Sequence, residues 1–168
     1  MMKITVSILL LICLSIMLLG CQEKAEPINK PVTFYFSCSE FDHGNENSVI
    51  AGETRESAGF ENDIMGLLNL YLSGPESEDL RSTFPADVKL LEYRVEDGTA
   101  ILTVTDQLSL VDGIELTVAC ACIAKTVMKL SGLEAVKIQT QTVNLGNKPY
   151  IIMDQSTILL LDDTEIHP

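Results

Sequence analysis

Tryptophan is absent from this chain of 168 residues, and aromatic residues account for only 5% of it. Sites that stack sugar rings or nucleobases depend on aromatic faces, so the composition disfavours them. Basic residues are also few, 11 against 24 acidic ones, which gives a formal net charge of −13. Because such a surface repels phosphate groups, the charge excludes nucleic-acid binding and charge-driven docking on anionic membranes.

The sequence also lacks the motifs of common catalytic and metal sites. It contains neither Gly-x-Ser-x-Gly nor Cys-x-x-Cys, which disfavours a serine hydrolase and a thiol oxidoreductase. His43 follows Asp42, and His167 ends an acidic stretch that begins at Asp162. Neither spacing matches a zinc or EF-hand site, and a Ser-His-Asp site would need one of these two histidines. We therefore expect a protein that is not an enzyme and has no metal site and no cofactor.

The first 21 residues determine where the rest of the chain works. Lys3 is their only charged residue, all but three of the residues from Ile4 to Leu19 are apolar, and Gly20 and Cys21 stand just before a polar stretch. A cationic start, an apolar middle and a small residue before the cleavage point are typical of a secretory signal. A cysteine directly after that small residue is typical of a lipoprotein signal. In such a signal the Cys21 thiol receives a diacylglycerol with palmitate-type acyl chains and becomes the mature N-terminus.

A transmembrane anchor is the alternative interpretation of the same residues. Their apolar run is about 16 residues long, whereas a spanning helix needs roughly 20. Two acyl chains hold a protein at a membrane far more firmly than one chain does. The sequence therefore predicts a signal peptide at 1–20 and a mature protein attached by lipid to the extracytoplasmic face of the cell membrane.

Removal of the signal peptide leaves 148 residues, a length that suits one domain. Only Lys3 is lost among the charged residues, so the formal charge changes from −13 to −14. Residues 21–31 are charged and contain two prolines, and we interpret them as an extended tether. The folded domain is expected at 32–161, followed by an acidic tail at 162–168.

In the first half of the domain, alternation of apolar and polar residues predicts a strand at Val32–Cys38 with one buried face. Val49–Arg55 is expected to return beside it as a second short strand. Apolar residues at helical spacing predict a helix over Phe60–Ser73, and Gly74-Pro75 ends it.

The stretch Lys89–Asp106 contains the strongest local signal in the chain. Asp97-Gly98 favours a type I′ hairpin turn, because both residues tolerate the positive φ that this turn needs. With these two residues as the loop, three cross-strand pairs are expected on one face of the hairpin: Val95 with Ala100, Tyr93 with Leu102, and Leu91 with Val104.

A second helix is predicted at Ile114–Leu130, with an apolar stripe through Leu116, Cys120, Ile123, Val127 and Leu130. Strands are expected at Ala135–Val143 and Tyr150–Met153, and a last edge strand at Thr157–Leu161. The resulting order, β-α-β-β-α-β, predicts an α/β fold of the α+β type. We expect a two-layer sandwich in which two helices pack on one face of a small mixed sheet.

Three cysteines remain once the signal is removed and Cys21 is lipidated: Cys38, Cys120 and Cys122. Cys120 and Cys122 point about 200° apart on a helix, so they do not bridge one another there. A disulfide between Cys38 and Cys120 is geometrically allowed, but small buried apolar side chains are the favoured interpretation. Cys122 is expected on the polar side of the helix, where it would be the more reactive thiol.

Taken in order and spacing, these segments resemble the GerMN domain family of sporulation and spore-germination lipoproteins. The resemblance extends from about Val32 to Ile152. The matching pieces are the first strand, Glu53–Glu56, Leu67-Leu68, Ser73–Pro75, Leu80–Pro85, the hairpin at Glu96–Ala100 and the stretch Val127–Val136. The family usually has an aromatic-containing segment around a serine after the hairpin, whereas this chain has Thr105–Leu108.

The resemblance implies a fold similar to the ring-building modules of sporulation channels and secretion systems, in a Gram-positive bacterium. It also implies a module without catalytic residues, which binds envelope or sporulation proteins, or itself, in sporulation or germination. The alternative is a lipoprotein that captures a solute or a cell-wall fragment, which requires a concave pocket with convergent polar groups. A third hypothesis is a thiol-dependent enzyme that uses the three cysteines.

Overall fold

The computed structural model describes residues 30–39 and 49–162, with side chains described as far as Ile158. The elements follow one another along the chain as β1 (Pro31–Cys38), β2 (Ile50–Glu56), α2 (Ile64–Leu72), β3 (Leu80–Arg81), β4 (Leu90–Glu96), β5 (Thr99–Val104), the 3-10 helix η1 (Asp106–Leu110), α3 (Gly113–Ser131), β6 (Ala135–Thr140), β7 (Ile151–Asp154) and α4 (Gln155–Asp162).

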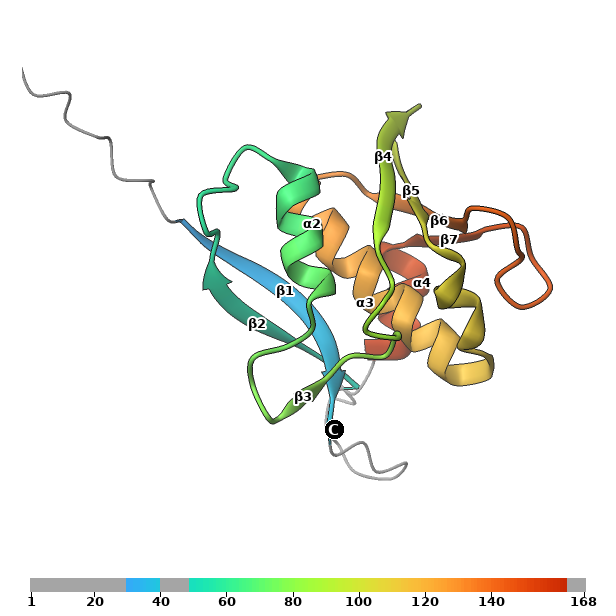
Figure 1. The fold of residues 1–168 in the computed structure, drawn as a ribbon, viewed down its shortest axis with the longest axis horizontal. Coiled ribbons are helices and arrows are strands. Elements are labelled where there is room, and N and C mark those ends of the chain that lie inside the picture. The colour runs from blue at the N-terminus through green and yellow to red at the C-terminus, as the bar shows by residue number, and fades with distance from the viewer. Residues whose placement is uncertain (1–29, 40–48, 163–168) are drawn as a thin grey trace, which may run out of the picture.

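The strands divide between two sheets (Figure 1). β1 is the central strand of a three-stranded antiparallel sheet of order β2-β1-β3. The other sheet has the order β4-β5-β6-β7, and its central strands β5 and β6 are parallel. Parallel neighbours need a crossover connection, which α3 provides. The predicted α+β class with a small mixed sheet is confirmed, while the pattern did not predict that β1 and β2 belong to a separate sheet.

The hairpin of β4 and β5 has the predicted turn. Asp97 and Gly98 have φ values of 48° and 76°, both in the left-handed region that a type I′ turn requires. The two predicted pairs nearest the turn are present. The third is wrong, because Leu90 and not Leu91 lies opposite Val104. A β-bulge around Leu91 shifts the register there.

Helix α3 lies between the two sheets (Figure 1). It packs against β1 of one sheet and against β6 and β7 of the other. Its buried residues therefore include most of the predicted stripe and also residues outside it: Val118, Ala119, Ala121, Cys122, Ala124 and Thr126. The prediction of a single apolar face was too narrow, since a helix packed on both sides needs two.

A buried threonine joins α3 to the edge of β1. The backbone N–H of Tyr35 donates a hydrogen bond of 2.9 Å to Thr126 Oγ1. One edge of β1 pairs with β2, but the other pairs with β3 only at Ser37 and Cys38. An unpaired buried N–H costs about 1–3 kcal/mol. Because the Thr126 hydroxyl accepts the hydrogen bond of the Tyr35 N–H, α3 covers this edge without leaving that donor unpaired.

The predicted edge strand at Thr157–Leu161 is wrong, because these residues lie in α4. The carboxylate of Asp154 accepts hydrogen bonds from the Thr157 backbone N–H, at 2.8 Å, and from the hydroxyls of Ser156 and Thr157. These hydrogen bonds lower the pKa of Asp154 to about 2. Such an arrangement at the start of a helix favours helix over strand, despite the apolar run that follows.

An aromatic cluster fills the space between β1 and α2. The ring centre of Tyr71 lies 4.9 Å from that of Phe36, 5.8 Å from that of Phe34 and 5.6 Å from that of Phe84. The guanidinium of Arg55 lies 5.5 and 5.4 Å from the centres of the Phe34 and Phe36 rings. The cation therefore stacks on the same rings that α2 covers.

Arg55 is buried with partners for its charge. It forms an ion pair with Glu53 and donates a hydrogen bond of 2.6 Å to the carbonyl of Gly74. Glu53 also accepts hydrogen bonds from the backbone N–H groups of Glu76 and Ser77. Burial alone would raise the pKa of Glu53, but the hydrogen bonds from Ser77, Arg55 and Glu76 lower it overall. This pair thus fastens the turn after α2 to β2.

Candidate functional site

The predicted lipid-attachment residue Cys21 and the two histidine stretches, with His43 and His167, lie outside the described residues, so they stay predictions. Within residues 30–39 and 49–162, no group of three His, Cys, Asp or Glu side chains is placed to hold a metal ion. No helix in the same ranges combines the length and the apolar character needed to cross a membrane.

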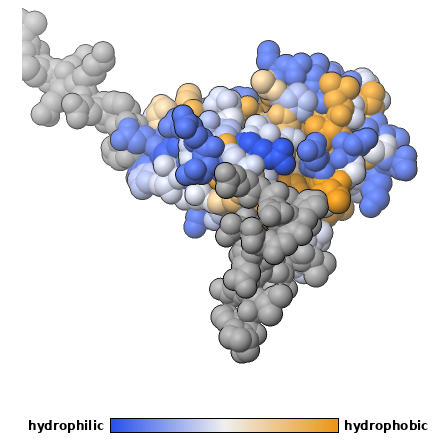
Figure 2. Space-filling model, turned by 90° about the horizontal axis from the view of Figure 1, so that it is seen from below, coloured by the Kyte–Doolittle hydropathy of each residue, from blue (hydrophilic) through white to orange (hydrophobic). Residues whose placement is uncertain are grey.

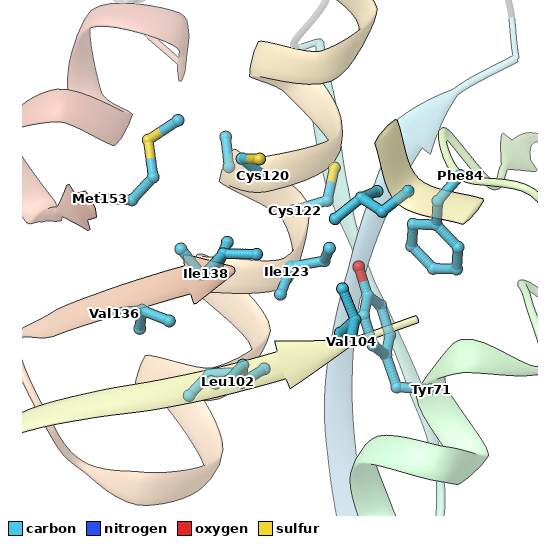
Figure 3. Close-up of a cluster of buried hydrophobic side chains, with 14 of the residues drawn as sticks. Tyr71, Phe84, Leu102, Val104, Cys120, Cys122, Ile123, Val136, Ile138 and Met153 are labelled. Atoms are coloured by element: carbon cyan, nitrogen blue, oxygen red, sulfur yellow. The ribbon is translucent and has the colours of Figure 1, made fainter. Parts of the chain in front are cut away.

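The three predicted thiol positions do not form one site. No disulfide joins Cys38, Cys120 and Cys122. In Figure 3, Cys120 lies on the side of α3 that faces Met153, whereas Cys122 lies towards Tyr71. Both helical cysteines are buried, each in the packing of a different side of α3.

The expectation that Cys122 lies on a polar face is wrong, because its side chain is only 1% exposed. The position is indeed opposite the predicted stripe, but the three-stranded sheet covers that side of α3. Burial raises the pKa of the Cys120 thiol to about 12. Burial also raises the pKa of Cys122 to about 12, although nearby Lys125 acts to lower it. Both thiols are therefore protonated at neutral pH, the form that is a poor nucleophile.

An exposed apolar surface lies where η1 leads into α3. Leu110 is 77% exposed and Ile114 is 70% exposed, the highest values among the large apolar side chains that the structure describes. Ile114 also lines a small pocket of about 170 Å³, together with Val49, Val118 and polar residues that include Arg81 and Glu115. We call Leu110, Ile114 and this pocket the corner patch. Figure 2 shows hydrophobic surface on this side of the molecule, bordered by hydrophilic residues.

The corner patch is held in place by the residues around it. Leu108 is fully buried and anchors η1, so that Leu110 points outward. The carboxylate of Asp106 accepts hydrogen bonds from the Thr142 hydroxyl, at 2.5 Å, and from the Thr142 N–H, at 2.9 Å, and these bonds lower the pKa of Asp106. Gly113 then turns the chain into α3 with a φ of 57°, a value that favours glycine.

Acidic side chains border the corner patch. Asp112 and Glu115 are exposed on either side of Ile114 in the sequence. Arg81 offsets part of this charge, since its guanidinium lies 3.9 Å from the Glu115 carboxylate. The patch is therefore apolar at its centre and mainly acidic at its rim.

A second surface feature lies at the other end of α3. It is a groove of about 400 Å³ between α3, β1 and α4, with Lys125 and Lys129 among its lining residues. We call it the lysine groove. The two surfaces share one helix but differ in charge: two lysines and one carboxylate, Glu134, line the groove, whereas two carboxylates and Arg81 border the corner patch.

A family model described as sporulation and spore germination, and named Germane, matches residues 33–141. The chain belongs to the Germane family. The match begins in β1 of this Germane domain and ends just after β6, so it includes α3 and the residues of the corner patch. The resemblance predicted from the sequence is confirmed.

Solved structures show the same fold for this Germane domain. The tandem GerMN domains of the sporulation protein GerM from Bacillus subtilis match with 16% identity and a TM-score of 0.58, over 83% of this chain and 49% of that chain. The chain thus spans about half the length of the tandem protein. The first GerMN domain of the same protein matches with 17% identity and a TM-score of 0.52, over 74% of this chain and 98% of that one.

A candidate lipoprotein from Clostridium perfringens also matches, with 19% identity over 84% of this chain and 99% of that chain. Its TM-score of 0.46 is too low to extend the likeness to function. Comparison with curated proteins found no match.

The sequence reasoning did not single out the two exposed residues of the corner patch. A signal was present, because Ile114, Val118 and Cys122 form a second apolar series at helical spacing, about 200° from the predicted stripe. This second series gives α3 a second apolar side, but it does not show which segment covers that side. Its first member, Ile114, lies beyond the covering sheet and is left exposed.

Proposed function

We propose that this protein is a lipid-anchored module on the extracytoplasmic face of the cell membrane. In this proposal it acts in sporulation or spore germination by binding an envelope protein, and it catalyses no reaction. Membership of the Germane family supports the biological process. The corner patch is the observation that carries the binding role.

Exposure of Leu110 and Ile114 is unfavourable unless something covers them. Burial of a leucine or isoleucine side chain in a complex contributes about 1.5–3 kcal/mol. Both residues lie on elements fixed by buried neighbours, so little conformational freedom is lost on binding. A preformed apolar surface of this kind suits a protein partner.

The rim of the corner patch indicates the chemistry of that partner. Asp112 and Glu115 border the apolar centre, and the whole chain has a formal charge of −13. A second copy would therefore bring like charges together, whereas a partner with basic residues around an apolar side chain would be attracted. We propose such a partner, an apolar segment flanked by lysine or arginine.

The tether fits the same role. Ten residues, 21–30, would separate the lipid on Cys21 from β1, which begins at Pro31. When extended, they span up to about 33 Å. A domain on such a tether can reach a partner that projects from the same membrane, while the lipid keeps its local concentration high.

A photo-crosslinking amino acid at Leu110, in the full chain on membranes of sporulating cells, tests the binding role. We expect one cross-linked protein, joined through a segment that is apolar and basic. Ile114→Asp should abolish this product, while Ile152→Asp, at an equally apolar and 52% exposed position on β7, should leave it unchanged. Absence of any product, or a product formed only between two copies of this chain, would contradict the proposed partner.

The lipid anchor is tested separately. We expect the N-terminal peptide of the mature protein to begin at Cys21 and to carry a diacylglycerol mass. Cys21→Ala should move the protein out of the membrane fraction without changing its thermal unfolding. An unmodified Cys21 in the membrane-bound protein would remove the anchor from the proposal.

Capture of a small ligand is the second candidate function. The lysine groove is a concave pocket of the kind that it requires, and its volume of about 400 Å³ lies in the range of small-molecule sites.

A further inference from the structure

The lysine groove combines an apolar floor with two cations. Tyr35, Met128, Leu133 and Ile158 provide apolar surface, from β1, α3, the loop after α3 and α4. Lys125 and Lys129 lie on α3 one turn apart, on the same side of the helix. The groove is therefore built by three segments, β1, α3 with the loop that follows it, and α4, which meet only in the folded chain.

Tyr35 positions the first cation. The Lys125 ammonium lies 4.9 Å from the centre of the Tyr35 ring. The backbone N–H of Tyr35 donates a hydrogen bond to Thr126, the residue next to Lys125, so the strand that carries the ring is fixed beside this turn of α3. This contact keeps the ammonium over the apolar floor rather than extended into water.

Stabilisation of the helix end does not account for both lysines. The carbonyls of Val127 and Met128 already accept hydrogen bonds, from the Ser131 hydroxyl at 2.7 Å and from the Gly132 N–H at 2.9 Å. The helix dipole favours cations here, but like charges one turn apart repel each other by a similar amount. The dipole also gives no reason for the two cations to line a groove.

We propose that the lysine groove binds an anionic amphiphile, a molecule with a phosphate or carboxylate group on an apolar body. The anion would lie between Lys125 and Lys129, and the apolar body would lie on Tyr35, Met128 and Leu133. Glu134 also lines the groove, so two lysines stand against one carboxylate and leave the groove cationic. Although the chain is acidic overall, charges further away than about 8 Å are largely screened at physiological salt. The ligand is either a free molecule or the head group and upper chain of a membrane lipid.

Octyl phosphate is a suitable probe, because it has both parts and is soluble as a monomer. We expect calorimetric titration of the mature protein to show saturable binding of octyl phosphate, with inorganic phosphate and octanol each binding at least tenfold more weakly. Because each lysine would donate a charge-assisted hydrogen bond to the anion, Lys125→Gln and Lys129→Gln should each weaken binding about tenfold or more.

The chain offers a matched control. Lys137 lies 4.2 Å from the centre of the Tyr150 ring, the same kind of lysine–tyrosine contact outside the groove. Lys137→Gln should leave octyl phosphate binding unchanged, and so should Leu110→Asp in the corner patch. The second control separates this inference from the proposed protein–protein contact, since either can fail without the other.

A co-sedimentation experiment distinguishes a free ligand from a membrane lipid. It uses phosphatidylglycerol vesicles and the Cys21→Ala variant, which lacks the lipid anchor. Binding to vesicles that is lost in Lys125→Gln indicates a lipid head group, whereas octyl phosphate binding without vesicle binding indicates a free molecule. Three results would overturn the proposal: no saturation by octyl phosphate at millimolar concentration, equal binding of inorganic phosphate, or equal loss of binding in Lys137→Gln.

Discussion

The two sheets pack on opposite sides of α3 with different chemistry. The three-stranded sheet presents Phe34 and Phe36 to Tyr71 and carries the buried ion pair of Arg55 and Glu53. The buried side chains of the four-stranded sheet are mainly aliphatic, and among them Leu102, Val104, Val136 and Ile138 are almost fully buried (Figure 3). We call the two regions the aromatic layer and the aliphatic layer.

The difference shows what each layer does. The aliphatic layer is continuous with the crossover β5-α3-β6, so apolar burial alone can hold it together. The aromatic layer must also fasten the turn around Gly74, which has no regular secondary structure. A buried cation with several hydrogen-bond acceptors fixes such a turn in one geometry. The stability of the aromatic layer then depends on each of these acceptors being in place.

The largest effect is expected from Arg55→Ala. Removal of the cation leaves the half-buried Glu53 carboxylate with only its backbone donors and the Gly74 carbonyl without its donor. Loss of one partner of a buried pair costs about 3–5 kcal/mol, and urea unfolding of the mature protein should register this loss. Arg94→Ala is the control, because the ion pairs of Arg94 with Glu92 and Glu96 lie on the exposed hairpin, and their loss should leave the midpoint nearly unchanged.

Ile138→Ala should have the next largest effect. Its side chain is fully buried on β6 of the aliphatic layer, so truncation leaves a cavity and costs about 2–4 kcal/mol in the free energy of unfolding. Ile152→Ala, on the adjacent strand β7 and largely exposed, should cost much less. Similar midpoints for the two variants would mean that the aliphatic layer does not behave as a packed core.

A smaller, pH-dependent effect separates the layers. The pKa of Glu53 is lower in the folded chain than its ordinary value of 4.5. The Glu53 carboxylate therefore contributes its full share to the free energy of unfolding above about pH 4.5. This share is lost as the pH falls through the lower pKa of the folded chain. Glu53→Gln should remove this part of the acid sensitivity, whereas Ile138→Ala should leave the slope of stability against pH unchanged. Unfolding midpoints measured from pH 3 to pH 7 provide the comparison.

The smallest effect is expected from thiol reagents. Cys120 and Cys122 report on opposite sides of α3, and both should react with a disulfide reagent only when the protein opens. Half-buried Cys38 should react first. In Arg55→Ala, the rate at Cys122 should rise more than the rate at Cys120, because only the aromatic layer is loosened. Rapid labelling of Cys122 in the unaltered protein would instead support the thiol-enzyme hypothesis.

Local patterns predicted much of this fold. The β1 alternation, the turn at Asp97-Gly98 and the α3 stripe each depend on neighbours within a few residues, and each was confirmed. The bulge at Leu91 and the helix α4 were not predicted. In both places the apolar pattern indicated a regular strand, but the hydrogen bonds of the backbone or of nearby side chains such as Asp154 favour another geometry. Of the candidate site residues, none was placed on the corner patch or in the lysine groove.

The family, the order of the longer elements from β1 to β7 and the class of fold were thus determined by the sequence itself, since hydrophobic period and turn chemistry are local properties of the chain. Only the tertiary structure decided that α3 is covered on both sides. That arrangement buries Cys122, leaves Ile114 exposed beyond the sheet and brings Lys125 over Tyr35. The reason is that burial depends on which segments meet in space, and a pattern read along one helix shows its faces without showing what covers them.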